Sequence, residues 1–561
     1  MVSTPSRHSS AIVLGWLRGY DRAALGPDVL AGLTAAAVIL PKAMAYATVA
    51  GLPVQLGLYT ALLAPIAYAV LGRSPVLSVT TSTTIGILTG SALAEAAPGV
   101  DAAGQIAAVA TLSVLVGVAL VFAAIARLGF VANFISEPVL SGFKAGIGAV
   151  IILDQAPKLL GVHVHKVGFF RDLLGLIRAA PDSSLATLAV SAVAIAAMLA
   201  LKHWLPRFPA ALGVVVLSIV ASALLDLPSR GVATIGEIPP GLPSPVLPDL
   251  HLLGELWAGA LAIALMSFTE TIAAERAFSP SGAPRPSANR ELVATGAANI
   301  ACGLVGGMPA GGGTTQTLVQ VSGGARTQLA GMLVGIASLA TLFLFAPALS
   351  RMPQAVLAAI MIIYSVELLS LRDFRAIAAI RRREVIWSLA AVAGVLILGT
   401  LKGILFAVVV SLIALGYQAS NPALYEVVRK RGTEVFRRRS EKHPEDESFP
   451  GLLLVRMEGR LFFGNTERVL DLIAPLVEAA HPRVVVLDCS AIFDVEYSAV
   501  KMLVEAAERA RRQGGDLWLA ALNPTVKTVV HRSPLGGALG PDRMFYDLGH
   551  AVEHFESRPA A

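Results

Sequence analysis

The sequence predicts an α-helical polytopic membrane protein with a small soluble α/β domain at its C-terminal end. Two observations carry this prediction. The 561 residues are 55% hydrophobic and only 15% charged, with a mean hydropathy of +0.70, whereas soluble chains carry about 25% charged residues. Apolar segments also follow one another through residues 28–420, and beyond them strand and helix patterns alternate.

Residues 28–420 are therefore expected to form the transmembrane domain, with about fourteen apolar segments, two of them short and interrupted. The segments span residues 29–50, 55–71, 79–94, 105–126, 135–156, 184–202, 210–225, 254–274, 290–305, 314–322, 327–349, 354–369, 385–400 and 402–418. Loops that a cytoplasmic N-terminus would place inside hold more Lys and Arg than the outer loops, as the positive-inside rule requires. We expect a multi-pass protein of the inner (plasma) membrane with both termini cytoplasmic, residues 1–27 forming the N-terminal segment.

The composition changes after residue 420. Residues 421–450 are rich in charge and are predicted to form a polar linker. Residues 451–556 then form the soluble domain, with strands at 452–455, 484–487 and 517–520 and helices at 464–480 and 497–513. Strand alternating with helix predicts a small α/β fold.

One interrupted stretch, Gly306–Gln320, is a poor continuous helix although it lies deep in apolar sequence. Five glycines and Pro309 oppose helix formation, and Thr314, Thr315 and Gln316 then offer polar side chains where a short helix could begin. Irregular backbone persists in a membrane only inside protein or beside a wet cavity. A helix start there presents free N–H groups and a positive dipole end, which is an anion site.

A second stretch, Gly72–Thr83, repeats this order of glycine, proline and hydroxyl residues. Overlaid without a gap, Gly72 falls on Gly306 and Thr80 on Thr314. Paired interrupted segments in corresponding halves are typical of transporter substrate sites. The alternative is two unrelated Gly/Pro-rich turns.

Several sequence blocks, in order along nearly the whole chain, resemble the SulP sulphate-permease family, also called solute carrier family 26. The blocks in the apolar part are Asp28–Thr34, Pro41–Ala47, Ala50–Pro53, Gly57–Tyr59, Asn289–Leu292, Asn299–Pro309 and Gly324–Gln328. The C-terminal part resembles a STAS domain through Gly459–Asn465 and Val486–Ser490.

The resemblance implies fourteen spans in two inverted seven-segment repeats, divided into core and gate subdomains. It implies an anion site between facing half-helices that start near Thr80 and Thr314, and assembly as a homodimer. Family members move sulphate, bicarbonate, chloride or dicarboxylates, some with protons or sodium. We therefore expect a secondary active transporter (a symporter) of a small inorganic or organic anion, working by alternating access. The alternatives are a passive anion channel and a membrane sensor that signals through its STAS domain.

Other function classes find no support in the sequence. No nucleophile–base pair or metal-ligand spacing is present, so neither an enzyme nor a metal site is expected. No cofactor is expected beyond a co-transported H⁺ or Na⁺. The net charge of +6 lies mostly in loops, so the expected partners are the anion, the lipid bilayer and a second copy of the chain, with no nucleic acid. Ser498 matches a position that is phosphorylated in STAS domains of another kind, but a packed loop serine is the preferred interpretation.

Two residues depart from the family pattern in complementary ways. Lys42 stands where the family usually has glutamine, and an intramembrane charge usually faces a partner or a wet cavity. Gln316 stands where the family often has an arginine that helps hold the anion. We hypothesise that the positive charge of the site has moved to Lys42; a snorkelling or structurally paired lysine is the alternative.

The remaining candidates surround these two residues. Thr80, Thr81, Ser82, Thr314 and Thr315 offer hydroxyl donors to an oxyanion, although single membrane threonines usually bond back to their own helix. Tyr46 matches an aromatic residue that walls the family's pocket, with simple packing as the alternative. Glu270 matches an acidic position associated with cation coupling, and it is equally a candidate salt-bridge partner of Lys42.

Overall fold

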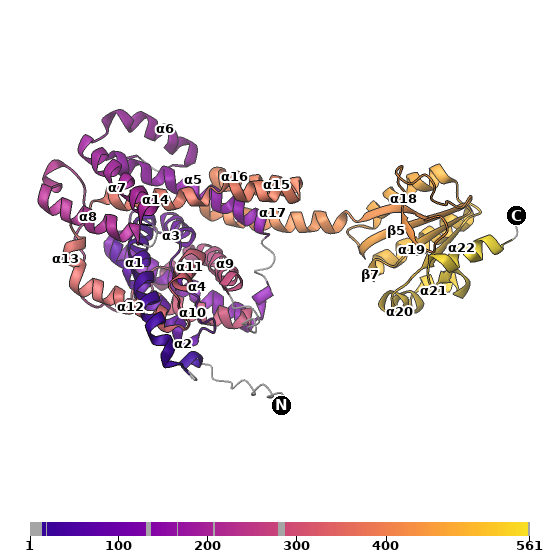
Figure 1. Ribbon diagram of the computed structural model, residues 1–561, viewed down its shortest axis with the longest axis horizontal. Helices are drawn as coiled ribbons and strands as arrows, with labels where there is room; N and C mark the ends of the chain where they lie inside the picture. Colours follow the sequence, from indigo (N-terminus) through magenta and orange to yellow (C-terminus); the bar gives the residue numbers. More distant parts are fainter. Residues whose placement is uncertain are drawn as a thin grey trace. The chain divides into compact units, whose positions relative to one another are not determined.

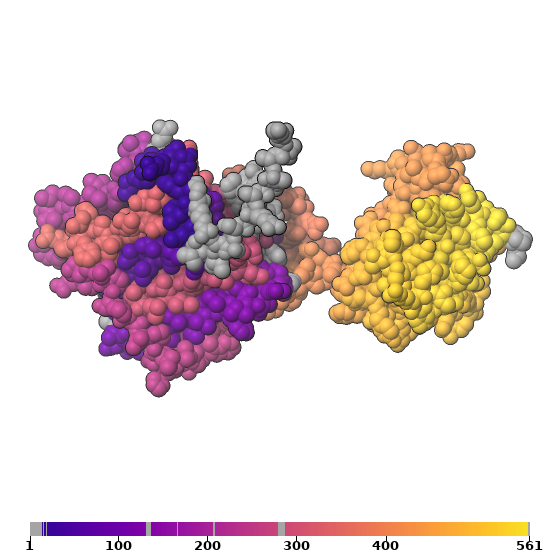
Figure 2. Space-filling view, turned by 90° about the horizontal axis from the view of Figure 1, so that it is seen from below, coloured from indigo at the N-terminus to yellow at the C-terminus, as the bar shows by residue number. Residues whose placement is uncertain are grey.

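The computed structural model describes residues 14–17, 20–130, 136–164, 167–205, 208–278 and 287–558. The chain divides into two compact units, Met1–Ser411 and Leu412–Ala561. Figure 1 traces the elements of each unit. In the space-filling view of Figure 2, the last part of the chain (yellow) forms much of the visible face of the second unit.

The first unit is helical, with one short two-stranded sheet. Its main elements are α1 (Leu25–Val49), α2 (Val54–Leu71), β1 (Val79–Thr80), α3 (Thr83–Ala96), α4 (Ala102–Ile125), α5 (Glu137–Leu160), α6 (Phe169–Ala179), α7 (Leu185–Trp204), α8 (Ala210–Leu225), α9 (Leu253–Phe278), α10 (Ala288–Gly303), β2 (Gly311–Gly312), α11 (Thr314–Ser322), α12 (Leu329–Ala340), a π-helical turn (Thr341–Phe345), α13 (Ala346–Leu349), α14 (Gln354–Leu368), α15 (Leu371–Ile380) and α16 (Arg382–Leu398). Helix α17 (Thr400–Ser420) begins in this unit and ends in the second.

The helical class predicted from composition is confirmed, and each predicted apolar segment lies over a helix. Among the described residues, nine helices are long and apolar enough to cross a membrane; the span count and the inverted repeats stay predictions. Two helices, α6 and α15, were not predicted. Both are short and amphipathic with no buried residue, so they lack the apolar run that marks the other helices.

The outer surface of this unit carries large exposed apolar side chains. Examples are Phe122 (68% exposed) and Ile125 on α4, and Leu224 on α8. In water such a surface would be an aggregation liability, whereas in a bilayer it faces the lipid chains. The surface therefore agrees with a membrane location.

The helices pack in two groups. In the first group α1, α2 and α12 pack on one another, as do α4, α9 and α10, with α3 and α11 against both α1 and α9. In the second group α5 packs against α14 and α16, and α7 against α8 and α14. Contacts between the groups include those of α1 with α8 and α14. We call these the core group and the gate group.

The second unit is built on a seven-stranded sheet in the order β4-β3-β5-β6-β8-β9, with β7 also paired to β5. Its elements are β3 (Ala423–Arg429), β4 (Phe436–Arg438), β5 (Leu452–Leu461), α18 (Thr466–Ala480), β6 (Val484–Asp488), β7 (Ile492–Val495), α19 (Tyr497–Arg512), β8 (Asp516–Ala520), α20 (Pro524–Arg532), α21 (Pro534–Leu539), β9 (Met544–Phe545) and α22 (Leu548–Ser557). Parallel pairing of β5, β6 and β8 gives the expected α/β fold.

Two features of the second unit differ from the sequence predictions. Residues 421–450, predicted as a polar linker, contain β3 and β4, and β3 pairs antiparallel with β5. Both strands and the segments after them carry many charged residues, among them Glu426, Arg429, Arg437 and Arg438, which is why composition suggested a linker. Ser498 lies exposed in the first turn of α19 rather than packed in a loop.

Candidate functional site

The two interrupted stretches meet directly. β1 pairs antiparallel with β2, with Val79 opposite Gly312 and Thr80 opposite Gly311. The Thr81 hydroxyl extends this bridge by donating to the Pro309 carbonyl at 2.8 Å. Segments more than 200 residues apart in sequence therefore form one structural element, with a half-helix leaving from each strand.

Glycine is required in β2 because α9 passes close behind it. A Cβ on Gly312 would lie 2.8 Å from the Cα of Thr271, and one on Gly311 would lie 2.9 Å from the Ser267 hydroxyl. The same α9 residues bond the strand: Thr271 Oγ1 accepts from the Gly312 amide at 2.8 Å, and Ser267 Oγ donates to the Ala310 carbonyl at 2.7 Å.

A buried asparagine completes this support. Asn299 on α10 accepts from the amide of Ala310 and donates to its carbonyl, each at 2.9 Å. The irregular backbone thus keeps its hydrogen bonds within protein, as a membrane interior demands.

The first half-helix begins later than expected. Thr80 lies in β1, and α3 starts only at Thr83. The delay has a local cause, because Ser82 is the N-cap and its hydroxyl accepts from the Ile85 amide. The gapless overlay therefore matches Thr80, a strand residue, with Thr314, a helix residue.

The second half-helix, α11, begins at Thr314 as expected, after the N-cap Gly313, which has no capping side chain. Its first-turn amides are the orphan donors of a helix start. Gln316 is 4% exposed, and its Nε2 donates to the Thr81 carbonyl at 3.2 Å. Its amide lies against Gly313, where a Cβ would overlap it, so Gln316 ties the two interrupted stretches together.

Close approaches to α1 show at which level of the fold α3 and α11 begin. A Cβ on Gly86 of α3 would lie 3.3 Å from Tyr46, and one on Gly323, just after α11, would lie 2.8 Å from Ala31. Counted back from these contacts at a rise of about 1.5 Å per residue, the first residues of α3 and α11 both lie at the level of the α1 segment around Lys42. Figure 1 draws α1, α3 and α11 together in the helical unit.

Lys42 is buried, with 3% of its surface exposed. Its ammonium lies 3.9 Å from the ring centroid of Tyr364 on α14, and within the described residues it forms no hydrogen bond or ion pair. A desolvated cation–π contact is worth about 2 kcal/mol, while a buried cation without a counter-charge costs several kcal/mol. Glu367, one turn beyond Tyr364 on α14, interacts with this charge electrostatically but is itself ion-paired with Lys202.

Glu270 does not pair with Lys42. It is buried on α9, and its Oε2 accepts from the Ser82 hydroxyl at 2.7 Å. The salt-bridge alternative for these two residues is therefore wrong for this structure. Ser82 instead links Glu270 to the start of α3, because the same hydroxyl caps that helix.

The hydroxyl candidates fall into two sets. Thr80 and Thr81 are buried at 1% exposure, and within the described residues the Thr80 hydroxyl has no partner. Thr314 and Thr315 are exposed at the start of α11. The buried Tyr46 lies one turn beyond Lys42 on α1.

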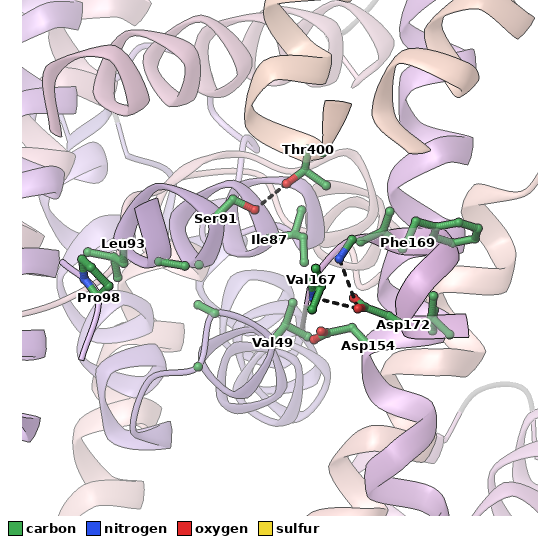
Figure 3. Close-up of a pocket in the computed structure, with 18 of the residues that line it drawn as sticks. Val49, Ile87, Ser91, Leu93, Pro98, Asp154, Val167, Phe169, Asp172 and Thr400 are labelled. Carbon is green, nitrogen blue, oxygen red and sulfur yellow. Dashed lines mark hydrogen bonds between the residues drawn. The ribbon is translucent and has the colours of Figure 1, made fainter. Parts of the chain in front are cut away.

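The main cavity lies away from these residues. It has a volume of about 660 Å³ and is lined by the ends of α1 and α5, by α3 and by residues 395–400. Figure 3 shows the hydrogen bond between the Ser91 and Thr400 hydroxyls in its lining, with Asp154 beside Val49. None of the predicted site residues lines it, but Ile87 and Ser91 do, so it extends along α3 beyond Tyr46.

Sequence reasoning missed the residues that support the site. Ser267 and Thr271 are spaced one helical turn apart, which was a usable signal, and Asn299 was noted only as part of a family block. Tyr364 gave no signal, since one tyrosine in an apolar helix usually packs. Among the described residues no cluster of three His, Cys, Asp or Glu could hold a metal.

Comparison with known proteins identifies relatives of both parts of the chain. Residues 25–391 match the model of the sulfate permease family, and residues 443–551 match the STAS domain. A probable sulfate transporter of Mycobacterium tuberculosis is 33% identical over 97% of this chain and 99% of its own length. Mouse solute carrier family 26 member 10 is 28% identical over 96% of this chain and 85% of its own length.

Solved structures share the fold. Murine solute carrier 26 family member A9, an anion transporter in the inward-facing state, matches with a TM-score of 0.88 at 21% identity, covering 99% of this chain and 97% of its own. The transmembrane domain of a cyanobacterium bicarbonate transporter matches with a TM-score of 0.58 at 23% identity, over 70% of this chain and 98% of its own.

Proposed function

The chain belongs to the sulfate permease family, whose members are transporters and not enzymes, and from that premise we propose that it is a secondary active transporter of a small anion. The observation that carries the proposal is the buried Lys42 ammonium, which forms no ion pair among the described residues and lies at the level where α3 and α11 begin. The acidic residue that acts on it electrostatically, Glu367 of α14, is already ion-paired with Lys202. A small anion would supply the missing negative charge.

Four sets of groups form the proposed anion site. Lys42 supplies the full charge, and the uncapped first turn of α11 supplies amide donors and a partial positive charge. Thr314, Thr315 and Thr80 donate hydroxyl hydrogens to anion oxygens. Tyr46 walls the site, one turn along α1.

Gln316 has mainly a structural role in this proposal, although its position first suggested that it binds the anion. Its amide already bonds the Thr81 carbonyl, so it holds the α11 start against the β1 stretch and offers the anion at most its remaining hydrogen. The charge that the family often places here then comes from Lys42.

Transport in this proposal is alternating access, in which the core group moves against the gate group around the site. Glu270 couples a cation to this motion. Its hydrogen bond to Ser82 joins the coupling carboxyl to the start of α3, so gain or loss of a proton there alters the anion site directly. Coupling to sodium at the same carboxyl is the alternative.

Sulfate is the first candidate substrate, because the M. tuberculosis relative is named a probable sulfate transporter. Bicarbonate and dicarboxylates are also compatible, since the site lacks the family's arginine. We further propose a homodimer in the plasma membrane with both termini in the cytoplasm, the STAS domain regulating or stabilising it.

Reconstitution tests this function. Purified protein in liposomes is screened for uptake of labelled sulfate, bicarbonate, chloride and fumarate, with and without proton and sodium gradients. We expect saturable uptake of at least one anion that a gradient accelerates and that unlabelled anion on the far side exchanges. Uptake that does not saturate would instead indicate a channel, and binding without flux would indicate a sensor.

A further inference from the structure

The partner that the structure gives to Lys42 lies in the other helix group. Lys42 belongs to α1 of the core group, whereas Tyr364 belongs to α14, which packs against α5 and α7 of the gate group. The ammonium-to-ring distance of 3.9 Å is well inside the range of about 6 Å for a cation–π contact.

The chemistry of this partner matters for a site that binds anions. A carboxylate in the place of Tyr364 would hold the ammonium but cancel its charge, and an entering anion would have to displace it. The face of an aromatic ring attracts the ammonium through its quadrupole and carries no net charge. Lys42 is thus fixed in position while its positive charge stays available.

We propose that Tyr364 is a positioning residue of the anion site, holding the buried Lys42 ammonium on the gate group while leaving its charge free for the substrate. This inference rests on the proposed function, because it needs Lys42 to act on the anion. Tyr364 sets the affinity for the anion through Lys42. It also makes that affinity depend on how the core and gate groups sit against each other.

The test separates the contribution of the Tyr364 ring from that of its hydroxyl group. Tyr364→Phe keeps the aromatic face, and Tyr364→Leu replaces it with a smaller apolar side chain. The anion is the one with the highest saturable uptake in the four-anion screen. For both variants KM and Vmax come from initial uptake rates in liposomes, and a second readout is the rise in Tm of the detergent-purified protein with anion concentration.

We expect Tyr364→Leu to raise KM about tenfold, the loss of a contact of cation–π strength, with Vmax changed less than about twofold. Tyr364→Phe should keep KM within about twofold of the parent. A merely structural role would instead lower Vmax and Tm in both variants and leave KM unchanged, and that result would overturn the inference.

A double-mutant cycle shows whether the effect passes through Lys42. In the Lys42→Gln background, Tyr364→Leu should produce no further loss of anion-dependent Tm rise. An equal loss in both backgrounds would contradict the inference while leaving the proposed function intact. If Lys42→Gln itself left uptake and the Tm rise unchanged, the charge assignment in the proposed function would fail first.

Discussion

At the scale of single residues, the site is organised by side chains that bond twice. The Ser82 hydroxyl caps α3 and donates to Glu270, and Gln316 folds over Gly313 while bonding the Thr81 carbonyl. Lys42 is the exception, since its charge has no such partner within the described residues. In the proposed site the anion binds at this unsatisfied group rather than at the satisfied ones.

Glu270 gives a prediction at this scale. Glu270→Gln keeps a side-chain oxygen for the Ser82 hydroxyl but removes the carboxylate that the proposed coupling needs, so it should preserve anion exchange and abolish acceleration by a proton gradient. Uptake and exchange in liposomes measure the two separately. Retained gradient dependence would show that the coupling cation binds elsewhere.

At the scale of elements, the β1–β2 bridge explains why the interrupted stretches hold so many glycines. Strand β2 lies so close to α9 that a Cβ on Gly312 would be only 2.8 Å from the Thr271 Cα. Backbone contact of this kind leaves no flexible side-chain end that could move aside.

Gly312→Ala should therefore destabilise the protein by about 1–3 kcal/mol, the usual cost of overpacking, and should lower uptake. The matched control is Gly254→Ala in α9, where a Cβ would meet nothing within 4 Å and alanine favours the helix. Thermal unfolding in detergent compares them. Equal Tm values for both variants would contradict the tight bridge.

In the STAS unit, α22 begins with a pH-dependent cap. Asp547 accepts from the His550 amide and lies 2.8 Å from its ring nitrogen, and this hydrogen bond raises the pKa of His550. The contribution to stability is complete below the ordinary histidine pKa of about 6.5 and is lost as pH rises through the raised value.

Amide hydrogen exchange of α22, corrected for the intrinsic pH dependence, measures this loss. Protection of the helix should fall between about pH 6.5 and the raised pKa in the parent chain. In the control His550→Gln it should stay flat. A fall of the same size in that control would remove His550 as the cause.

At the scale of the whole molecule, every residue of the proposed anion site lies within the first compact unit, Met1–Ser411. Affinity for the anion should then be a property of this unit alone. The STAS unit would influence assembly, stability or rate.

A chain that ends at Ser420, the last residue of α17, should keep the KM of the full chain within about twofold, because a twofold change in KM is only about 0.4 kcal/mol. A lower Vmax or a lower yield of folded protein is compatible with this prediction. Uptake kinetics in liposomes at equal protein incorporation make the comparison. A large rise in KM would place part of the binding energy in the second unit.

Much of this architecture was predictable from sequence, for physical reasons. Apolar runs mark helices that face lipid, and the glycine–proline–hydroxyl order marked both interrupted stretches before their pairing was known. What could not be predicted depends on contacts between distant segments. Thr80 became a strand residue because Gly311 lies opposite it, and Tyr364 became the partner of Lys42 because α14 crosses α1 there.

The strand character of residues 423–429 escaped prediction for a related reason. The residues that pair with β5, Ala423, Leu424, Tyr425 and Glu426, mix apolar and charged side chains, and the pairing decides their structure. Local composition favoured a linker because it shows how charged a segment is but not which strand the segment pairs with.

We propose above all that the positive charge of the site resides on Lys42, because Gln316 stands where the family often has arginine. One measurement tests it directly: uptake of the transported anion by the parent chain, Lys42→Gln, and Lys42→Gln with Gln316→Arg, in liposomes of equal protein content. We expect Lys42→Gln to reduce uptake at least about tenfold, the loss of a charge-assisted contact, and the added arginine to restore a substantial part of it. Undiminished uptake by Lys42→Gln would contradict the claim.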